Sequence, residues 1–397
     1  MNNLKTLLSI ALFSFIFLAS CNKKETAEKD FQTSLQNIAD SIYQSFNTEW
    51  GIDNAGIHFY ISGLSGSFMA SSNITPKPSP DSHFRVASIT KTFTAASIML
   101  LHQQGELNIN DTITSYLPNT SNFDIPNKNI ITIKQLLQHR SGVFDVSNND
   151  IPATVSAPYA GMKYEDYIRN QNDLHSFTFE EMIGVNAEHQ LSTALPDDGF
   201  YYSNTGYNIL GRIIEEVSGI SYSEFIAEKF TIPLGLTGTY SPWQGSEVEM
   251  QTPYINSYFY MVGETPIETS QNNVSIHVAE GNIVSTPEDI TKWIKLLLTG
   301  NAGINSSNVA LMKEMEIADE GHGLYGLGLI YDDLGYGHNG IHQSYVSSTR
   351  YNPNNGISIL VSANFIRFDP AVGQESIFEL AYALRDAMHV VVEEYQK

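Results

Sequence analysis

Apolar residues recur at helical spacing near the start of the chain and then switch to short strand-like runs. Between about Phe31 and Phe46 they lie three or four positions apart, at Leu35, Ile38 and Ile42, which predicts a helix with one buried face. The segments IHFYIS and SFMAS follow, separated by the glycine-containing GLSG, and this arrangement predicts a hairpin of two strands.

The pattern then becomes helical over a long stretch and returns to strands near the end. A helix is predicted from Ser88 to Gln104, where Gly105 can end it as a C-cap. From about residue 111 to residue 298, loops alternate with amphipathic segments such as TIKQLLQHR, NILGRIIEEVSG and EDITKWIKLLLTG. Near the end, LGLIYDD, SYVSSTRYNP and GISILVSAN are strand-like, and a final helix is predicted from about Glu375.

Strands at both ends with helices between them predict an α/β protein of the α+β type. We expect one domain over residues 36–397, with an antiparallel sheet built from residues 36–80 and 320–397. A mostly helical region would be inserted between these two parts of the sheet. The helices near the two ends of the chain would cover one face of the sheet.

The composition allows a large core and excludes one class of partner. The chain has 397 residues and is 42% hydrophobic, which is enough apolar material for a large core. Its formal net charge is −22, and clusters of basic residues that could neutralise phosphates are missing. Nucleic acid is therefore not expected as a partner.

The first residues predict the compartment. Lys5 precedes the apolar run LLSIALFSFIFLA, which is too short for a comfortable membrane span and ends before Leu-Ala-Ser-Cys21. This ending resembles the lipobox of bacterial lipoproteins, and Cys21 is the only cysteine. We expect a lipoprotein signal peptide over residues 1–20, a lipid on Cys21 and a flexible polar tether over residues 21–35. The protein would then be exported and anchored to a membrane, in the periplasm or at the cell surface. The alternative is an ordinary signal peptide with an incidental cysteine.

The first motif with chemical potential is Ser88-Ile-Thr-Lys91. On a helix, positions three apart share a face, so the Ser88 hydroxyl and the Lys91 amine can meet. A helix that starts at Ser88 also directs backbone N–H groups toward a bound carbonyl. A lysine in a dry cleft tends to lose its proton and can then accept the proton of a serine. Taken alone, the pattern fits an N-capping serine followed by a surface lysine better than it fits a catalytic pair.

The second motif is Tyr202-Ser-Asn204. A phenol is a poor base, but a neighbouring lysine ammonium would favour its anion, so Tyr202 could relay protons to a leaving group. Asn204 offers an amide that can bind a substrate carbonyl and hold Lys91. Nothing local excludes the alternative, in which Tyr202 is one of 21 tyrosines beside an ordinary turn.

The third motif, His338-Asn339-Gly340, precedes a strand-like segment. Gly340 would let a substrate backbone lie against the strand edge without an intervening side chain. His338 could polarise or orient a bound group. A hairpin histidine without a catalytic role fits the local sequence as well.

In their order and spacing, the three motifs resemble those of the class C β-lactamase-like serine hydrolases. This family includes DD-carboxypeptidases, class C β-lactamases, D-amino-acid peptidases and amidases, and some esterases. The likeness extends from about Phe84 to Asn364 and includes FRVASITKTFTA, GELNINDTITSYLP, YYSNTGYNILG, GNIVSTPEDITKW and YGLGL followed by GHNG. It implies a DD-peptidase/β-lactamase-like fold.

The resemblance also implies a role for each motif residue. Ser88 would be the acylated nucleophile, Lys91 its proton acceptor and Tyr202 the general acid or base, while Asn204 would bind the substrate amide. The backbone N–H groups of Ser88 and Ile341 would form the oxyanion hole. His139 and Ser141-Gly142 resemble a structural turn of the family and are kept out of the site.

Two departures from the family pattern bear on the substrate. His338 stands where class C β-lactamases have lysine, which resembles the DD-peptidase and D-aminopeptidase branches, and Ser344 stands where many relatives have glycine.

The leading prediction is a D-alanyl-D-alanine carboxypeptidase-like, penicillin-binding enzyme that acts on a peptidoglycan stem peptide and binds β-lactams. An esterase or D-amino-acid amidase is the first alternative, and a non-catalytic envelope-binding lipoprotein is the second. No metal or organic cofactor is expected, because side chains and backbone fill every role. A cationic partner for a substrate carboxylate stays unassigned, with Arg350 as a candidate.

Overall fold

The computed structural model describes residues 28–242, 247–319, 322–342, 344–373 and 375–397. The predicted signal peptide, Cys21 and the start of the predicted tether lie outside the described residues. A helix occupies residues 28–50, and Leu35 on it is fully buried. The prediction of a tether that reaches residue 35 is therefore wrong for residues 28–35, because the apolar face of the helix packs against the sheet.

An eight-stranded sheet forms the centre of the molecule, and every pair of neighbouring strands in it is antiparallel. In spatial order the strands are β2 (Gly66–Ser72), β1 (Ile57–Gly63), β12 (Ile357–Ala363), β11 (Tyr345–Asn352), β10 (Gly335–His342), β9 (Ile330–Asp332), β8 (Leu324–Tyr325) and β7 (Glu316–Ile317). The N-terminal hairpin β1–β2 thus joins the C-terminal strands, with His58 opposite Ser362 across β1 and β12. The predicted sheet from both chain ends is confirmed, and β7 extends it slightly before residue 320.

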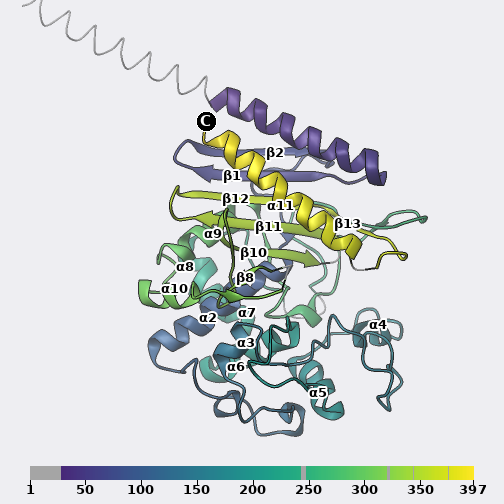
Figure 1. The fold of residues 1–397 in the computed structure, drawn as a ribbon, viewed down its shortest axis with the longest axis vertical. Coiled ribbons are helices and arrows are strands. Elements are labelled where there is room, and N and C mark those ends of the chain that lie inside the picture. The colour runs from purple at the N-terminus through teal and green to yellow at the C-terminus, as the bar shows by residue number, and fades with distance from the viewer. Residues whose placement is uncertain (1–27, 243–246, 320–321, 343, 374) are drawn as a thin grey trace, which may run out of the picture.

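The region between the two parts of the sheet is mostly helical, as predicted (Figure 1). Its helices are α2 (Thr90–Gln104), α3 (Ile133–Leu137), α4 (Tyr164–Arg169), α5 (Phe179–His189), α6 (Asn204–Ser218), α7 (Tyr222–Ile226), α8 (Ile232–Leu234), α9 (Pro287–Leu298) and α10 (Ser306–Met312). Short turns of 3₁₀ helix are η1 (Ala87–Ile89), η2 (Ile113–Ser115), η3 (Ser121–Phe123) and η5 (Ser275–His277), and η4 (Ala227–Thr231) is a π-helical turn. Gly105 ends α2 with φ 76°, as its predicted role as a C-cap requires.

The same region also contributes two small sheets, which the sequence pattern did not predict. Strands β4 (Tyr258–Met261) and β5 (Ile267–Glu268) form one of them with β13 (Phe365–Phe368), and β3 (Phe84–Arg85) pairs with β6 (Val284–Ser285) in the other. These strands are two to four residues long, and runs of that length carry no readable alternation.

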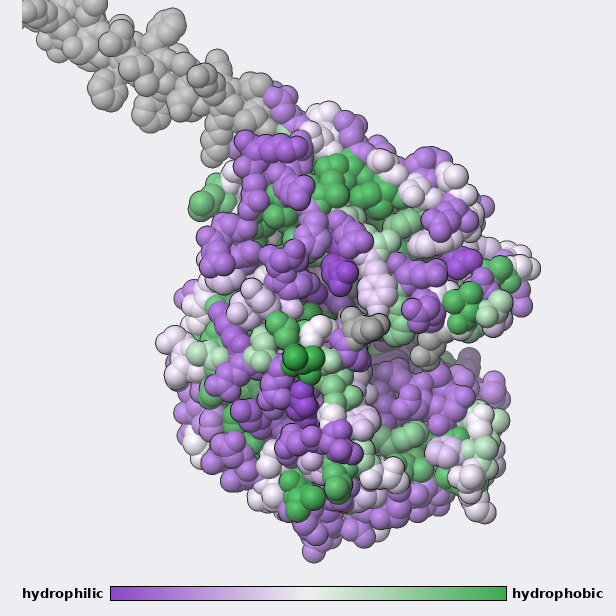
Figure 2. Space-filling model, viewed as in Figure 1, coloured by the Kyte–Doolittle hydropathy of each residue, from purple (hydrophilic) through white to green (hydrophobic). Residues whose placement is uncertain are grey.

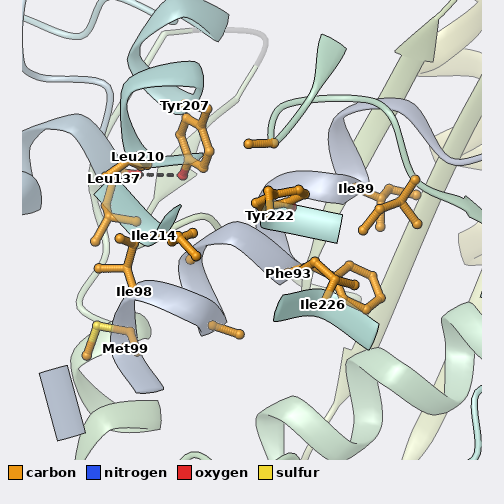
Figure 3. Packing of buried hydrophobic residues seen from close by; sticks show 14 of the residues in the cluster. Ile89, Phe93, Ile98, Met99, Leu137, Tyr207, Leu210, Ile214, Tyr222 and Ile226 are labelled. Carbon is orange, nitrogen blue, oxygen red and sulfur yellow. Dashed lines mark hydrogen bonds between the residues drawn. The ribbon is translucent and has the colours of Figure 1, made fainter. Parts of the chain in front are cut away.

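Two hydrophobic cores lie on opposite faces of the main sheet. On one face, the C-terminal helix α11 (Glu375–Tyr395) packs with the helix of residues 28–50, so the predicted covering by the terminal helices is confirmed (Figure 1). On the other face, α2 lies at the centre of the helical region and is buried over most of its length (Figure 3). Phe93 of α2 stacks on Trp293 of α9 with ring centroids 3.9 Å apart. This packing fixes the N-terminal end of α2 close to the sheet.

Candidate active site

Ser88 lies in the 3₁₀ turn η1 that leads into α2, at the floor of a cleft between the sheet and the helical region. Its hydroxyl is partly accessible, whereas the flanking Ala87 and Ile89 are buried. Ala87 has φ 50°, a left-handed conformation that is unfavourable for a residue with a Cβ atom. Strain of this kind persists where the surrounding packing enforces it, and it often occurs at functional sites.

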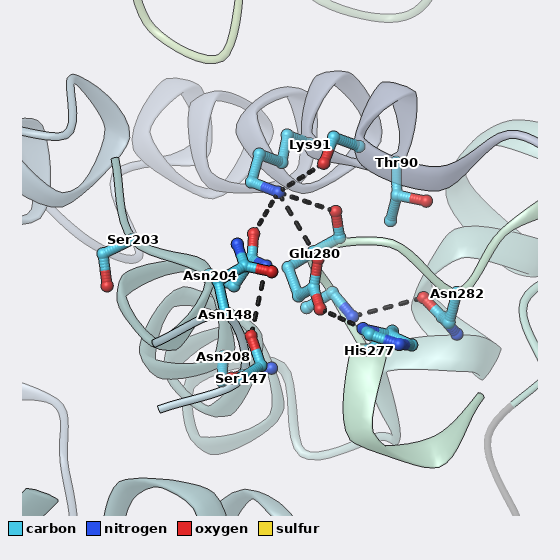
Figure 4. A network of polar contacts seen from close by, with 12 residues as sticks. Thr90, Lys91, Ser147, Asn148, Ser203, Asn204, Asn208, His277, Glu280 and Asn282 are labelled. Carbon is cyan, nitrogen blue, oxygen red and sulfur yellow. Dashed lines mark hydrogen bonds and ion pairs between the residues drawn. The ribbon is translucent and has the colours of Figure 1, made fainter. Parts of the chain in front are cut away.

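Lys91 lies one turn after Ser88 and is completely buried. Its Nζ donates hydrogen bonds to Ser88 Oγ at 3.0 Å, Asn204 Oδ1 at 2.7 Å and the Glu280 backbone oxygen at 2.9 Å (Figure 4). Loss of hydration lowers the pKa of Lys91, while the negative charges of Glu280 and Asp145 oppose this shift. The arrangement therefore keeps the Lys91 amine in contact with the serine hydroxyl. Burial also makes the amine easier to deprotonate.

Glu280 also belongs to this network, although no sequence motif indicated it. Its carboxylate Oε2 lies 3.4 Å from Lys91 Nζ, and its Oε1 contacts His277 Nδ1 at 2.5 Å (Figure 4). The carboxylate is nearly fully buried, and it raises the pKa of His277 although burial alone would lower it. Glu280 is 189 residues away from Lys91 in the chain, so no local spacing could have indicated the pair.

Tyr202 directly precedes α6, whose N-cap Ser203 accepts a hydrogen bond from the Gly206 N–H. Its ring is stacked between His139, with centroids 4.1 Å apart, and His322, at 4.7 Å. Burial raises the pKa of Tyr202 well above its ordinary value, and the hydrogen bond with Ser88 only partly opposes this. The expectation that Lys91 favours the tyrosine anion is therefore wrong for this structure, because loss of hydration outweighs any help from the lysine.

Asn204 occupies the first position of α6 and is held on three sides. Its backbone N–H donates to Asp145 Oδ2 at 3.0 Å, its Nδ2 donates to Ser147 Oγ at 3.1 Å and its Oδ1 accepts from Lys91. The Asn204 side chain thus contacts Lys91, and only one of the two hydrogens on its Nδ2 is used by Ser147.

The turn around His139 packs against Tyr202 and Ser203 of the second motif. His139 Nδ1 accepts the Ser203 N–H at 3.0 Å in addition to stacking on Tyr202. A Cβ atom on Gly142, which has φ 70°, would lie 2.5 Å from the Ala194 oxygen. The predicted structural turn thus contacts the site directly.

The third motif lies on β10, and its residues point alternately to the two faces of the sheet. A Cβ atom on Gly340 would lie 2.3 Å from the Val86 oxygen, so only glycine lets η1 approach the strand this closely. The predicted role of Gly340, to make room for a substrate backbone, does not fit this geometry, because Val86 and Ala87 of the protein itself fill the space. Its role is to bring Ser88 next to β10, where Ile341 also lines the cleft.

His338 is buried on the same face of β10, and both of its ring nitrogens have protein partners. Nδ1 faces the Asn339 carbonyl oxygen at 2.6 Å, so it must carry the proton, and Nε2 accepts from the Tyr325 hydroxyl at 2.9 Å. Burial and the nearby Lys91 lower the pKa of His338 well below 6.5, which keeps the ring neutral. His338 lines the cleft, and its role in polarising or orienting a bound group stays a prediction.

The guanidinium of Arg350, the candidate for binding a substrate carboxylate, is occupied by hydrogen bonds within the protein. It is buried and bonds to Asp332 Oδ2, Asn339 Oδ1 and the Ser348 hydroxyl. Ser344, by contrast, lines the cleft with φ 71°, the left-handed conformation that glycine adopts without strain. The backbone geometry at Ser344 is therefore one that glycine adopts more easily than serine.

The cleft has a volume of about 780 Å³ and is lined by all three motifs. Figure 2 shows it as a notch at the right-hand edge, between the part of the molecule that carries the sheet and the helical part. Across the described ranges, no set of three or more histidine, cysteine, aspartate or glutamate side chains is arranged to hold a metal ion. Within the same ranges, no helix is both long and apolar enough to cross a bilayer.

The fold and the arrangement of the three motifs define the class of protein to which the chain belongs. The chain belongs to the β-lactamase family, since the family model described as Beta-lactamase matches residues 53–380. Among individual proteins, it is 29% identical over 223 residues to Protein flp of Staphylococcus aureus (strain N315), covering 56% of this chain and 40% of that protein. It is also 29% identical over 227 residues to Penicillin-binding protein 4* of Bacillus subtilis (strain 168), covering 55% of this chain and 45% of that protein. The chain thus spans less than half the length of these curated relatives.

Solved structures support the same fold. The D-amino acid amidase of Ochrobactrum anthropi SV3, complexed with L-phenylalanine, matches with a TM-score of 0.73 at 22% identity, over 93% of this chain and 100% of that one. A D-stereospecific amidohydrolase from Streptomyces sp. matches with a TM-score of 0.70 at 24% identity, over 83% and 94%. The predicted family and the predicted fold are confirmed.

Proposed function

We propose that this chain cleaves an amide or ester through an acyl-enzyme formed on Ser88. The observation that carries the proposal is the contact of 3.0 Å between the Ser88 hydroxyl and the fully buried amine of Lys91, at the floor of an open cleft. A serine activated in this way attacks a carbonyl carbon, and a second step with water releases the acyl group.

In the first step, neutral Lys91 takes the proton of Ser88 while the serine oxygen bonds to the substrate carbonyl carbon. The lowered pKa of Lys91 makes the neutral amine accessible, and Asn204 holds the amine in position. Tyr202 keeps its phenolic proton because its pKa is raised, so it acts as an acid. It gives this proton to the leaving nitrogen or oxygen as the bond to the carbonyl carbon breaks, and the Lys91 ammonium restores the proton balance. In the second step, water attacks the ester and Ser88 recovers its proton.

The negative oxygen that develops would be held by the backbone N–H groups of Ser88 and Ile341. The close packing of η1 against Gly340 supports this assignment, since it keeps the serine turn beside β10. Preorganised donors of this kind typically contribute about 3–4 kcal/mol each to the transition state.

The charges that line the cleft bear on the choice of substrate. A D-alanyl-D-alanine carboxypeptidase must hold a substrate carboxylate, which calls for an available cation. Among the described lining residues, Lys163 and Arg385 are the lysine and arginine side chains, whereas acidic side chains are more numerous: Asp145, Glu165, Asp166, Glu280 and Asp319. This balance favours an uncharged ester or amide, or a substrate with a free amine, over one that ends in a carboxylate.

We therefore rank a D-amino-acid amidase or peptidase reaction first and the D-alanyl-D-alanine carboxypeptidase reaction second. A panel of D- and L-amino-acid amides, a D-alanyl-D-alanine peptide, a short-chain ester and benzylpenicillin tests this order, with Ser88→Ala as the control. We expect the amide or ester to be cleaved at least about tenfold faster than the carboxylate-ended peptide. Faster cleavage of that peptide would reverse the order. No cleavage of any substrate would favour a non-catalytic binding protein.

We also propose that Cys21 carries a lipid that anchors the exported protein to a membrane. The sequence before Cys21 and its position as the only cysteine support this proposal. Labelling of the expressed protein with a radioactive fatty acid, compared with Cys21→Ala, tests it directly. Incorporation into both proteins, or into neither, would exclude the anchor.

A further inference from the structure

The cleft continues past Ser88 along an open strand edge. Strand β9 pairs with β10 only at Gly335–Gly337, whereas β10 pairs with β11 as far as His342. Among the described strands, the edge of β10 from His338 to His342 therefore has no partner on its outer side. An extended substrate can lie along such an edge and place groups on both faces of the sheet.

The two faces of β10 differ in chemistry at this edge. Gly340 is directed toward Val86 and Ala87, so His338 and His342, two positions away on either side, share the face of the helical region. His342 lies beside His277, with ring centroids 4.3 Å apart, and Glu280 bonds to His277. On the opposite face, Ile341 packs against the hydrophobic cluster that contains α11. One wall of the cleft is therefore polar and the other is apolar.

The apolar wall is built by five elements that are distant in the sequence. Strands β4, β5, β10 and β13 and helix α11 contribute to it, through Phe259, Ile267, Ile341, Ile366, Phe378 and Tyr382. All six line the same cleft as Ser88 and Tyr202. A group attached to the carbonyl under attack can reach this wall without leaving the cleft.

Helix α11 carries more apolar surface than its packing on the sheet uses. Leu380, Leu384 and Met388 are buried against the sheet. Phe378 and Tyr382 lie one turn apart on a second stripe, and their rings stack with centroids 6.5 Å apart. Phe378 is 38% exposed and Ile267, across the cleft wall on β5, is 57% exposed. Large apolar side chains exposed together in a cleft indicate a binding surface.

We propose that this wall is a substrate subsite for a large apolar group, aromatic or branched, attached to the carbonyl that Ser88 attacks. The inference rests on the proposed function and specifies its substrate class. A cleft of about 780 Å³ lies in the range that takes ligands much larger than an alanyl methyl group. Burial of an apolar group against Phe378 and Ile267 would add affinity in proportion to the area removed from water.

Boronic acids test the subsite without knowledge of the substrate. Each bonds reversibly to a nucleophilic serine oxygen and carries one group, which can occupy whichever side of Ser88 offers apolar surface. Dissociation constants of 2-phenylethylboronic acid and methylboronic acid would be measured by calorimetry on the full chain. The proteins are the wild type, Ile267→Asn, Phe378→Asn and the control Val390→Asn, which changes an exposed valine of α11 outside the cleft.

We expect the wild type and the Val390 variant to bind the phenylethyl compound at least about tenfold more tightly than the methyl compound. In the Ile267 and Phe378 variants this preference should fall to about threefold or less. Both side chains are more than one-third exposed, so their replacement leaves the cores intact. Equal affinities in the wild type, or an equal loss of preference in the Val390 variant, would overturn the subsite. Binding that is absent throughout, or unchanged in Ser88→Ala, would overturn the proposed function and the subsite with it.

Discussion

At the scale of single residues, the proposed mechanism depends on the protonation state of the Lys91 amine. Loss of hydration lowers the pKa of this amine, whereas the carboxylates of Glu280 and Asp145 raise it. Glu280 contacts both Lys91 and His277, so its charge is shared between an amine and an imidazole. The carboxylate therefore positions Lys91 and adjusts the pH at which the amine becomes neutral.

The substitution Glu280→Gln tests this adjustment. The active form carries neutral Lys91, so kcat/KM rises with pH through the pKa of Lys91. Removing the negative charge takes away an influence that raises this pKa, so the acid limb of the pH profile should move to lower pH. Loss of the contact with Lys91 should reduce the plateau by about tenfold at most.

A matched control for this variant is Glu288→Gln, which removes the same charge from an exposed position. Its pH profile should coincide with that of the wild type. An acid limb of the Glu280 variant that stays in place or moves to higher pH would contradict the account.

At the scale of elements, the site depends on the approach of η1 to β10. Both segments can be located from the sequence, because the spacing of Ser88 and Lys91 and the sequence around Gly340 are local. The contact between the two segments could not be predicted, and the role of Gly340 was misassigned for that reason. The partner of its missing Cβ atom is a backbone oxygen of Val86, which only the folded chain brings near.

The substitution Gly340→Ala measures this contact. A new Cβ atom would lie 2.3 Å from the Val86 oxygen, so the serine turn must move away from the strand. We expect a loss of about 1–3 kcal/mol in the free energy of unfolding and a larger fractional loss of kcat than of affinity. Gly184→Ala in α5 is the control, since the nearest atom to its Cβ lies at 3.7 Å. Unfolding in urea should leave that variant within about 1 kcal/mol of the wild type. Full activity of Gly340→Ala would contradict the proposed role of the contact.

At the scale of the whole molecule, the chain joins its two ends in one sheet and covers one face of the sheet with the terminal helices. This arrangement was predictable from the strand-like runs near both ends. A helix from about Phe31 was predictable as well, but its first residues were not, because Glu28, Lys29 and Asp30 are polar enough to suggest a tether. Leu35 was already visible as part of the apolar stripe, and its complete burial shows that the helix is needed to close the second core.

Two truncations follow from this observation. A protein that begins at residue 28 should unfold at the same temperature as one that begins at residue 22, since the buried helix is retained. A protein that begins at residue 51 loses the buried side chains Leu35 and Phe46 and should be destabilised by about 3–6 kcal/mol. Thermal unfolding followed by circular dichroism compares the three proteins. Equal midpoints for all of them would show that the helix of residues 28–50 contributes nothing to the fold.

The central claim is that Ser88 is the nucleophile of a serine hydrolase. The most direct measurement is the intact mass of the protein after reaction with an alkyl fluorophosphonate, in which the serine oxygen bonds to phosphorus and fluoride leaves. The account predicts that the wild type gains the mass of one phosphonyl group and that Ser88→Ala gains none. An unmodified wild type, or an equal gain of mass in the Ser88 variant, would contradict it.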